Sequence, residues 1–197
     1  MKKNFIKIIS TAVPIQIENI DTDQIIPARF LKTTLKEGIG ENLFRDWRFY
    51  PNGNLKKNFI LNNPIYKGKI LISEKNFGCG SSREHAIWAL IDYGFRVIIS
   101  SFFADIFEMN ALNNGLLIVK VSNFFLQKLF INVYSNPNTL IKIDLENQFI
   151  HIENNKKKEK FKISFFKKIC LINGYNDIDF LISIKNKIKF FEKKHNL

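Results

Sequence analysis

The fold is decided by residues 69–100, which read KILISEKNFGCGSSREHAIWALIDYGFRVIIS. Residues 69–73 and 96–100 are short apolar runs of strand character. Between them, apolar side chains recur at helical spacing, which predicts a helix over residues 81–93 that Gly94 ends. The helical apolar positions are Ala86, Ile87, Leu90 and Tyr93. A strand, a helix and a second strand in this order predict parallel pairing through a right-handed crossover.

The pattern continues in both directions from this stretch. Downstream, a second helix is expected from Phe103 to near Gly115, then a strand at 116–119 and a helix near 122–134. Upstream, residues 5–17 have strand character and lead into a polar turn at 18–24. Repeated alternation of strand and helix indicates an α/β protein.

The C-terminal third follows a different pattern. Residues 140–144 and 149–152 flank a polar turn and predict a β-hairpin, to which 160–163 could add a third strand. The lysine run at 156–160 is expected to be an exposed turn, and two helices are expected at about 165–173 and 177–194. We therefore expect an α/β sandwich with mixed strands, one domain over residues 1–197, with a helical tail from about 165.

Residues 25–63 contain many helix- and strand-breaking residues. These are Pro27, Gly38, Gly40, Pro51 and Gly53, with Pro64 just beyond. Short helices at best are expected there. An irregular stretch of this length in a compact domain is usually functional or interfacial.

Composition bounds the possible functions. A chain of 197 residues with 46% hydrophobic content can bury a core. The net charge of +12 leaves open an RNA- or anion-binding module, but the lysine-rich runs do not interleave with aromatic residues as in single-strand binders. Two cysteines argue for a reducing compartment, and the chain is expected to be cytoplasmic. No apolar run reaches the ~20 residues that cross a bilayer.

The segment from Gly78 to His85, GCGSSREH, carries the most chemical information. Ser81 and Glu84 have the spacing of a capping box, which predicts Ser81 as the N-cap of the central helix. Unpaired N–H groups at the helix start and the forked guanidinium of Arg83 would together hold an anion such as a carboxylate.

Several other interpretations of this segment compete with anion binding. Simple capping remains an alternative, whereas a dinucleotide fingerprint fails because its third glycine would fall at Arg83, and no phosphate-loop motif is present. His85 is more often structural than catalytic at such a position. Cys79 could be a nucleophile whose pKa the helix terminus lowers, but no partner is identifiable, since His151 and His195 fall in an expected edge strand and in the tail.

The early element Asp21-Thr22-Asp23 places two carboxylates two residues apart. A turn followed by a helix cap is the favoured interpretation, because a metal site would need more oxygen ligands than this stretch offers. No metal site is predicted in the chain.

Four motifs resemble the small subunit of bacterial 3-isopropylmalate dehydratase, a member of the aconitase superfamily. They are NIDTDQIIP at 19–27, LFRDWRF at 43–49, NFGCGSSREHA at 76–86 and FADIF at 103–107. The resemblance runs from near residue 5 to about 180. It implies the swivelling β/β/α domain of aconitase-like enzymes, and the interconversion of 2- and 3-isopropylmalate through isopropylmaleate in leucine biosynthesis.

The resemblance also implies roles for matching residues. Ser81 would be the catalytic base, while Arg83 and Ser82 would bind the dicarboxylate substrate. The loop 28–38 would meet the substrate side chain, with Thr33 and Thr34 as candidate contacts. Supporting residues would be Asp21, Asp23, Gly80, Glu84 and His85. A separate large subunit would carry the [4Fe–4S] cluster, and this chain would bind no cofactor, nucleic acid or membrane.

Two further hypotheses stay open at this point. A sister hydratase acting on citraconate or homocitrate-type acids would share the same chemistry. A self-sufficient enzyme built on Cys79 would need neither a partner nor a cluster.

Overall fold

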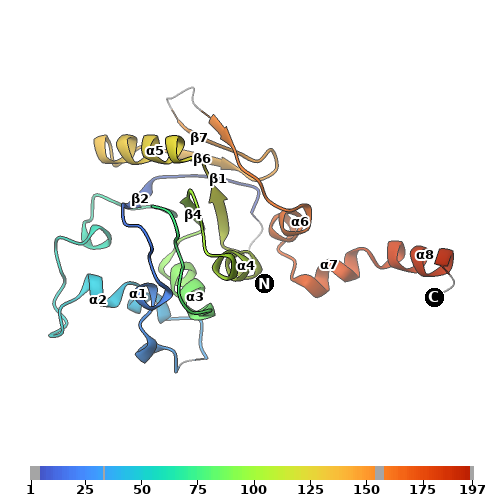
Figure 1. Ribbon diagram of the computed structural model, residues 1–197, viewed down its shortest axis with the longest axis horizontal. Helices are drawn as coiled ribbons and strands as arrows, with labels where there is room; N and C mark the ends of the chain where they lie inside the picture. Colours follow the sequence, from blue (N-terminus) through green and yellow to red (C-terminus); the bar gives the residue numbers. More distant parts are fainter. Residues whose placement is uncertain (1–4, 33, 154–157, 196–197) are drawn as a thin grey trace.

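The protein is built on two sheets (Figure 1), and each sheet has four strands. The computed structural model describes residues 5–32, 34–153 and 158–195. The first sheet is parallel and has the order β2 (Ala12–Ile15), β3 (Ile70–Ser73), β4 (Val97–Ser100) and β5 (Leu117–Lys120). The second is antiparallel, with the order β1 (Lys7–Ser10), β6 (Ile141–Asp144), β7 (Phe149–Ile152) and β8 (Lys158–Lys160). The predicted α/β class is confirmed, with parallel and antiparallel strands separated into different sheets.

The parallel sheet is buried on both faces, which explains its continuous apolar strands. Leu71 contributes to one core with α3 (Glu84–Tyr93) and α4 (Asp105–Asn114). Its neighbours Ile70 and Ile72 point the other way, into a second core shared with α5 (Asn123–Ser135) and the antiparallel sheet. Side-chain alternation along one strand thus joins the two halves of the molecule.

The two predicted crossovers and the hairpin are confirmed. Glycines in the left-handed conformation end α3 at Gly94 and α4 at Gly115. In the described part of residues 25–63, the helices are short, namely α1 (Thr22–Ile25), which overlaps the start of this range, α2 (Arg45–Arg48) and 3₁₀ turns at Ala28–Phe30, Ile39–Asn42 and Ile60–Asn62.

The strand character of residues 5–17 is confirmed, and the strand predicted after the hairpin was wrong in its bounds. Residues 5–17 form two strands in different sheets, because Thr11 lies between β1 and β2 and the chain changes sheet there. The strand that follows the hairpin and pairs with β7 is Lys158–Lys160 rather than 160–163. Part of the lysine run is therefore strand rather than turn. Residues 154–157 lie outside the described residues.

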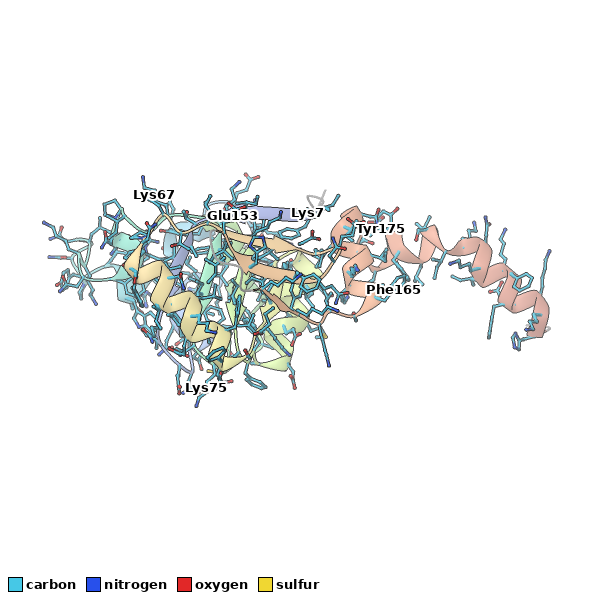
Figure 2. The ribbon with its side chains drawn as sticks, turned by 90° about the horizontal axis from the view of Figure 1, so that it is seen from above. Lys7, Lys67, Lys75, Glu153, Phe165 and Tyr175 are labelled. Atoms are coloured by element: carbon cyan, nitrogen blue, oxygen red, sulfur yellow. The ribbon has the colours of Figure 1, made fainter. Side chains whose placement is uncertain are left out.

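The chain closes with α6 (Phe165–Asn173), as predicted, and with two helices where one was expected. These are α7 (Asp177–Ser183) and α8 (Lys185–His195), divided at Ile184. Lys167 of α6 donates to Asn113 of α4 across 2.6 Å, which fixes α6 to the body. We call residues 177–195 the C-terminal arm, and it extends away from both sheets (Figures 1 and 2). None of the helices in the described ranges combines the length and apolar character that crossing a membrane requires.

Candidate active site

Three loops meet at the carboxyl edge of the parallel sheet and hydrogen-bond to one another. Gly78 donates its N–H to the carbonyl of Ile20 at 2.8 Å, and Thr22 donates its N–H to the carbonyl of Cys79 at 2.9 Å. On the other side, Asn76 donates to the carbonyl of Phe102 at 2.9 Å. Parallel pairing of the sheet therefore continues beyond the strand ends, and it brings motifs from three parts of the sequence together.

Two glycines are required where these loops touch. Gly78 (φ +79°) lies against the ring of Phe107, and Gly80 (φ +85°) lies against the carboxylate of Asp21. A Cβ at either position would collide with these groups, and both backbones are left-handed, where L side chains are disfavoured. Gly80 and Asp21 are therefore in close contact, and their supporting role stays a prediction.

The central helix begins later than predicted. Its N-cap is Arg83, with φ −100° and ψ 106°, and the first helical residue is Glu84. Within the described part of the chain no side chain caps this helix, so the predicted Ser81–Glu84 capping box was wrong. The pairing of residues 76–79 with neighbouring loops keeps residues 81–83 outside the helix.

Ser81 is exposed, and its backbone carbonyl accepts a hydrogen bond from a buried threonine. The Thr22 hydroxyl donates to the Ser81 carbonyl at 2.8 Å, and its oxygen lies 3.5 Å from the Ser81 Oγ. Thr22 is only 2% exposed. Sequence reasoning missed it, although a threonine between two aspartates at a helix start could have drawn notice.

Arg83 is held in place by Asp23. Its Nη1 forms an ion pair with Asp23 Oδ1 and lies 3.4 Å from the Ile26 carbonyl. The Arg83 side chain is 21% exposed, and the Asp23 side chain 55%. The Arg83 hydrogen bond holds the pKa of Asp23 below its ordinary value, so Asp23 is charged at neutral pH. Asp23, which was predicted as a supporting residue, contacts Arg83 directly.

Ser81, Ser82 and Arg83 line one hollow with Thr22, whose far wall is the start of α4. Ile106, Phe107 and Asn110 contribute to that wall, and Asn110 Nδ2 lies 3.5 Å from Ser82 Oγ. The hollow has a volume of about 260 Å³, slightly below the ~300–1,000 Å³ of typical small-molecule pockets. A hollow of this size and exposure is suited to completion by another surface.

Asp21 behaves as the favoured interpretation predicted. It is the N-cap of α1 and accepts from the Asp23 N–H at 2.7 Å, while Gln24 Oε1 accepts from the Asp21 N–H at 2.9 Å. Asp23 also accepts from the Ala28 N–H at 2.9 Å, which fixes the start of the loop at 28–38.

The remaining predicted residues lie around this hollow or beyond it. Glu84 accepts from Asn114 Nδ2 at 2.8 Å and so ties the start of α3 to the end of α4. His85 packs against the ring of Trp88, with centroids 4.5 Å apart, as expected of a structural residue. Thr34 is exposed and does not line the hollow, and Thr33 lies outside the described residues.

The thiol and imidazole alternatives lose support. Burial, together with the nearby Asp21 carboxylate, raises the pKa of Cys79, whereas a helix terminus was expected to lower it. His151 lies in β7, which pairs with strands on both sides, so its expected edge position was wrong. In the described ranges no three His, Cys, Asp or Glu side chains gather as a metal site.

A larger hollow, of about 710 Å³, lies elsewhere and gathers cations rather than the predicted catalytic residues. Arg29, Arg45 and Lys56 line it, but Arg29 forms an ion pair with Asp46, and Lys56 donates to the Asp46 carbonyl at 2.8 Å. Its charge is thus partly balanced within the chain.

Comparison with known proteins agrees with this geometry. Residues 2–124 match the family of the aconitase C-terminal domain. The 3-isopropylmalate dehydratase small subunit of Karelsulcia muelleri is 61% identical over 193 residues, which cover 98% of each chain. That of Cytophaga hutchinsonii is 58% identical over 97% of this chain and 95% of the relative.

A solved structure shares the fold. The crystal structure of 3-isopropylmalate dehydratase (leuD) from Methanocaldococcus jannaschii superposes with a TM-score of 0.64 at 25% identity. It covers 96% of this chain and 99% of its own length. This chain therefore belongs to the family of 3-isopropylmalate dehydratase small subunits, which have the aconitase C-terminal domain.

Proposed function

We propose that this chain supplies a serine base and a carboxylate clamp to an active site completed by a large subunit. The chain is the small subunit of a hydro-lyase of leucine biosynthesis. The reaction in which these groups would act is the interconversion of 2- and 3-isopropylmalate through isopropylmaleate. Exposed Ser81 and the Arg83 side chain line one hollow, and this is the observation that carries the proposal.

In this proposal, Ser81 removes the carbon-bound proton of the substrate. A serine hydroxyl is a poor base in water and acts as one only where fixed positive charge stabilises its alkoxide form. Arg83, two residues away, is the cation available in the hollow. Thr22 supports the role by fixing the Ser81 backbone, so the hydroxyl needs little reorganisation before it reacts.

Arg83 would bind one substrate carboxylate. The ion pair with Asp23 and the contact with Ile26 both use Nη1, which orients the planar guanidinium. A carboxylate entering the hollow would approach the remaining donors of the fork, where two parallel hydrogen bonds can form. Ser82, held near Asn110, would add a neutral hydrogen bond on the same wall.

The [4Fe–4S] cluster expected of this enzyme does not fit the residues of this chain. A four-iron cluster is held by several thiolates, whereas the chain has two cysteines, a half-buried Cys79 and a buried Cys170 in α6. We place the cluster on the large subunit, where it would supply Lewis-acid chemistry toward the leaving hydroxyl.

Three further hypotheses belong to the same proposal. The loop at 28–38, with Thr33 and Thr34, would meet the substrate side chain when the partner is bound. Residues 1–197 would form one domain with a helical tail from about 165, and the enzyme would work in the cytoplasm.

Reconstitution with the large subunit tests the proposal. The Ser81→Ala variant should lose about 10²–10⁴-fold in turnover, the usual contribution of a positioned acid–base group, and it should bind the large subunit as the wild type does. Ser135→Ala, an exposed serine at the end of α5, is the control and should retain full turnover. Near-normal rates for Ser81→Ala at saturating large subunit would refute the proposal.

A further inference from the structure

The C-terminal arm exposes large apolar side chains along its length. Ile178 and Ile182 of α7 are 67% and 65% exposed, and Phe190 and Phe191 of α8 are 72% and 55% exposed. Figure 2 shows the arm running outward beyond Tyr175, with side chains on all sides. Contiguous exposed apolar surface of this kind marks interaction sites.

Two exposed and two half-buried apolar side chains of the arm form one stripe. Leu181, Ile184, Ile188 and Phe191 recur three or four residues apart, which places them on one face of a helix. Helical hydrogen bonding continues through the division at Ile184, since Ile184 donates to the Phe180 carbonyl at 3.2 Å and Ile188 donates to the Ile184 carbonyl at 3.1 Å. The stripe therefore runs across both helices.

The charge of α8 restricts what can cover the stripe. This helix carries five lysines and a single glutamate in eleven residues. Two copies of the arm packed together would bring these lysines close to one another and repel. A surface with acidic side chains flanking an apolar groove is complementary to it in charge.

Helix α6, which precedes the arm, packs against α4, and α4 forms one wall of the candidate active site. Lys167 joins α6 to Asn113 near the end of α4, and Ile106 and Asn110 of α4 line the Ser81 hollow. Ile106 and Met109 of the same helix are 51% and 52% exposed. A protein that closed the hollow over α4 would thus meet the base of the arm.

We propose that the C-terminal arm is a docking element for the large subunit, which receives the Leu181–Phe191 stripe in an apolar groove flanked by acidic side chains. This inference rests on the proposed function, because it takes the large subunit as the partner. At 1.5 Å per residue, the nineteen residues 177–195 span roughly 28 Å. The arm can therefore hold the partner well away from the chemistry, and its loss weakens assembly rather than turnover.

Binding of the full chain to the large subunit tests the proposal without using activity. The Leu181→Asp/Phe191→Asp variant removes the anchors at the two ends of the stripe and should raise the Kd at least about 30-fold, the effect of losing an interface hot spot. Phe124→Asp/Ile131→Asp on α5, at sites 71% and 63% exposed, is the matched control and should bind as the wild type does. Equal affinity of the arm variant and the wild type would overturn the proposal.

A charge variant provides a second readout that leaves the stripe intact. Lys187→Glu/Lys189→Glu should raise the Kd about tenfold and flatten its dependence on salt. At saturating large subunit, both arm variants should regain wild-type turnover, whereas Ser81→Ala should not. If wild-type complexes form but never turn over isopropylmalate, the proposed function fails while the docking role is still decided by the Kd ratios.

The other occupants of the arm are outcomes of the same test. Basic amphipathic helices also bind anionic membranes, so the variants are compared in sedimentation with phosphatidylglycerol vesicles. Wild-type sedimentation that the arm variant loses, with unchanged large-subunit affinity, would assign the arm to a lipid surface and contradict docking. Concentration-dependent dimers that only the arm variant lacks, again with unchanged large-subunit affinity, would assign it to a second copy.

Discussion

The carboxyl edge of the parallel sheet and the C-terminal arm differ in almost every physical respect. At the sheet edge, three loops are hydrogen-bonded to one another, and glycines allow contacts that a Cβ would block. On the arm, apolar side chains and lysines extend outward from two helices joined at Ile184. The sheet edge fixes a few polar groups relative to one another. The arm presents a broad surface of apolar and basic side chains.

This contrast indicates how catalysis and subunit association can be assigned to different regions of one chain. Chemistry requires groups held within a fraction of an ångström, so it belongs where backbone pairing is dense. Association tolerates a mobile element, because many small contacts add up over its area. Substitutions at the sheet edge should therefore change turnover, and substitutions on the arm should change affinity for the large subunit.

After Ser81→Ala, the largest effect is expected at Arg83. Arg83→Gln removes the cation that would bind a substrate carboxylate and stabilise charge on Ser81, and kcat/KM should fall roughly 10²–10³-fold, as for the loss of one preorganised donor. Affinity for the large subunit should not change. Lys189→Gln on the arm also removes one cation and should change affinity only. A fall in turnover for Lys189→Gln at saturating partner would break the separation.

Gly80 and Gly53 provide a matched pair for the sheet edge. Both have φ +85°, but Gly80 contacts the Asp21 carboxylate, whereas no heavy atom among the described residues lies within 4 Å of a Cβ at Gly53. Alanine at either position should cost about 1–3 kcal/mol in the free energy of unfolding from backbone strain. Gly80→Ala should cost more, because Asp21 must move, and it should also reduce turnover. Equal unfolding free energies in urea would show that the contact is unimportant.

Thr22→Val sharpens the same region with an isosteric change. The variant removes one of two donors to the Ser81 carbonyl, which still accepts from the Arg83 N–H at 2.8 Å, so the free energy of unfolding should fall by about 0.5–1.5 kcal/mol and turnover should fall with it. Thr11 donates its hydroxyl to the Lys67 carbonyl at 2.6 Å, far from Ser81 in the fold. Thr11→Val should lower stability without lowering turnover. Similar turnover losses in both variants would argue against a positioning role for Thr22.

The smallest effect is expected from the titration of Asp23. Because Arg83 lowers its folded pKa, Asp23 stabilises the protein above its unfolded pKa, and this contribution is lost as the pH falls through the folded pKa. The side chain is 55% exposed, so the contribution should be below about 1 kcal/mol. Unfolding free energies of wild type and Asp23→Asn measured from pH 7 to pH 3 should differ less at the acidic end. A difference that grows toward pH 3 would contradict the assigned sign.

Much of the fold could be predicted from short-range patterns. The apolar strands β3, β4 and β5 and the glycines that end α3 and α4 have local causes, namely burial on both faces and the need for a left-handed residue. The hairpin of β6 and β7 follows from alternation around a polar turn. The likeness of four motifs to one family also placed Ser81 and Arg83 in one site before the structure did.

The errors came from contacts between distant segments. A capping box at Ser81 satisfies local rules, but Cys79 pairs with Asp21 and Phe77 pairs with Phe103, and the helix begins only at Glu84. Thr22 was overlooked because its partner lies fifty-nine residues away in the sequence. The raised pKa of Cys79 likewise reflects burial and a carboxylate that only the fold brings near.

Exchange of the carbon-bound proton of the substrate tests most directly whether Ser81 is the base. The reconstituted enzyme is incubated with 3-isopropylmalate in D₂O, and deuterium on carbon is followed by mass spectrometry at saturating large subunit. Deuterium should be incorporated by the wild type and by the arm variants, and it should not be incorporated by Ser81→Ala. Incorporation by Ser81→Ala at the wild-type rate would contradict it, because another group would then remove the proton.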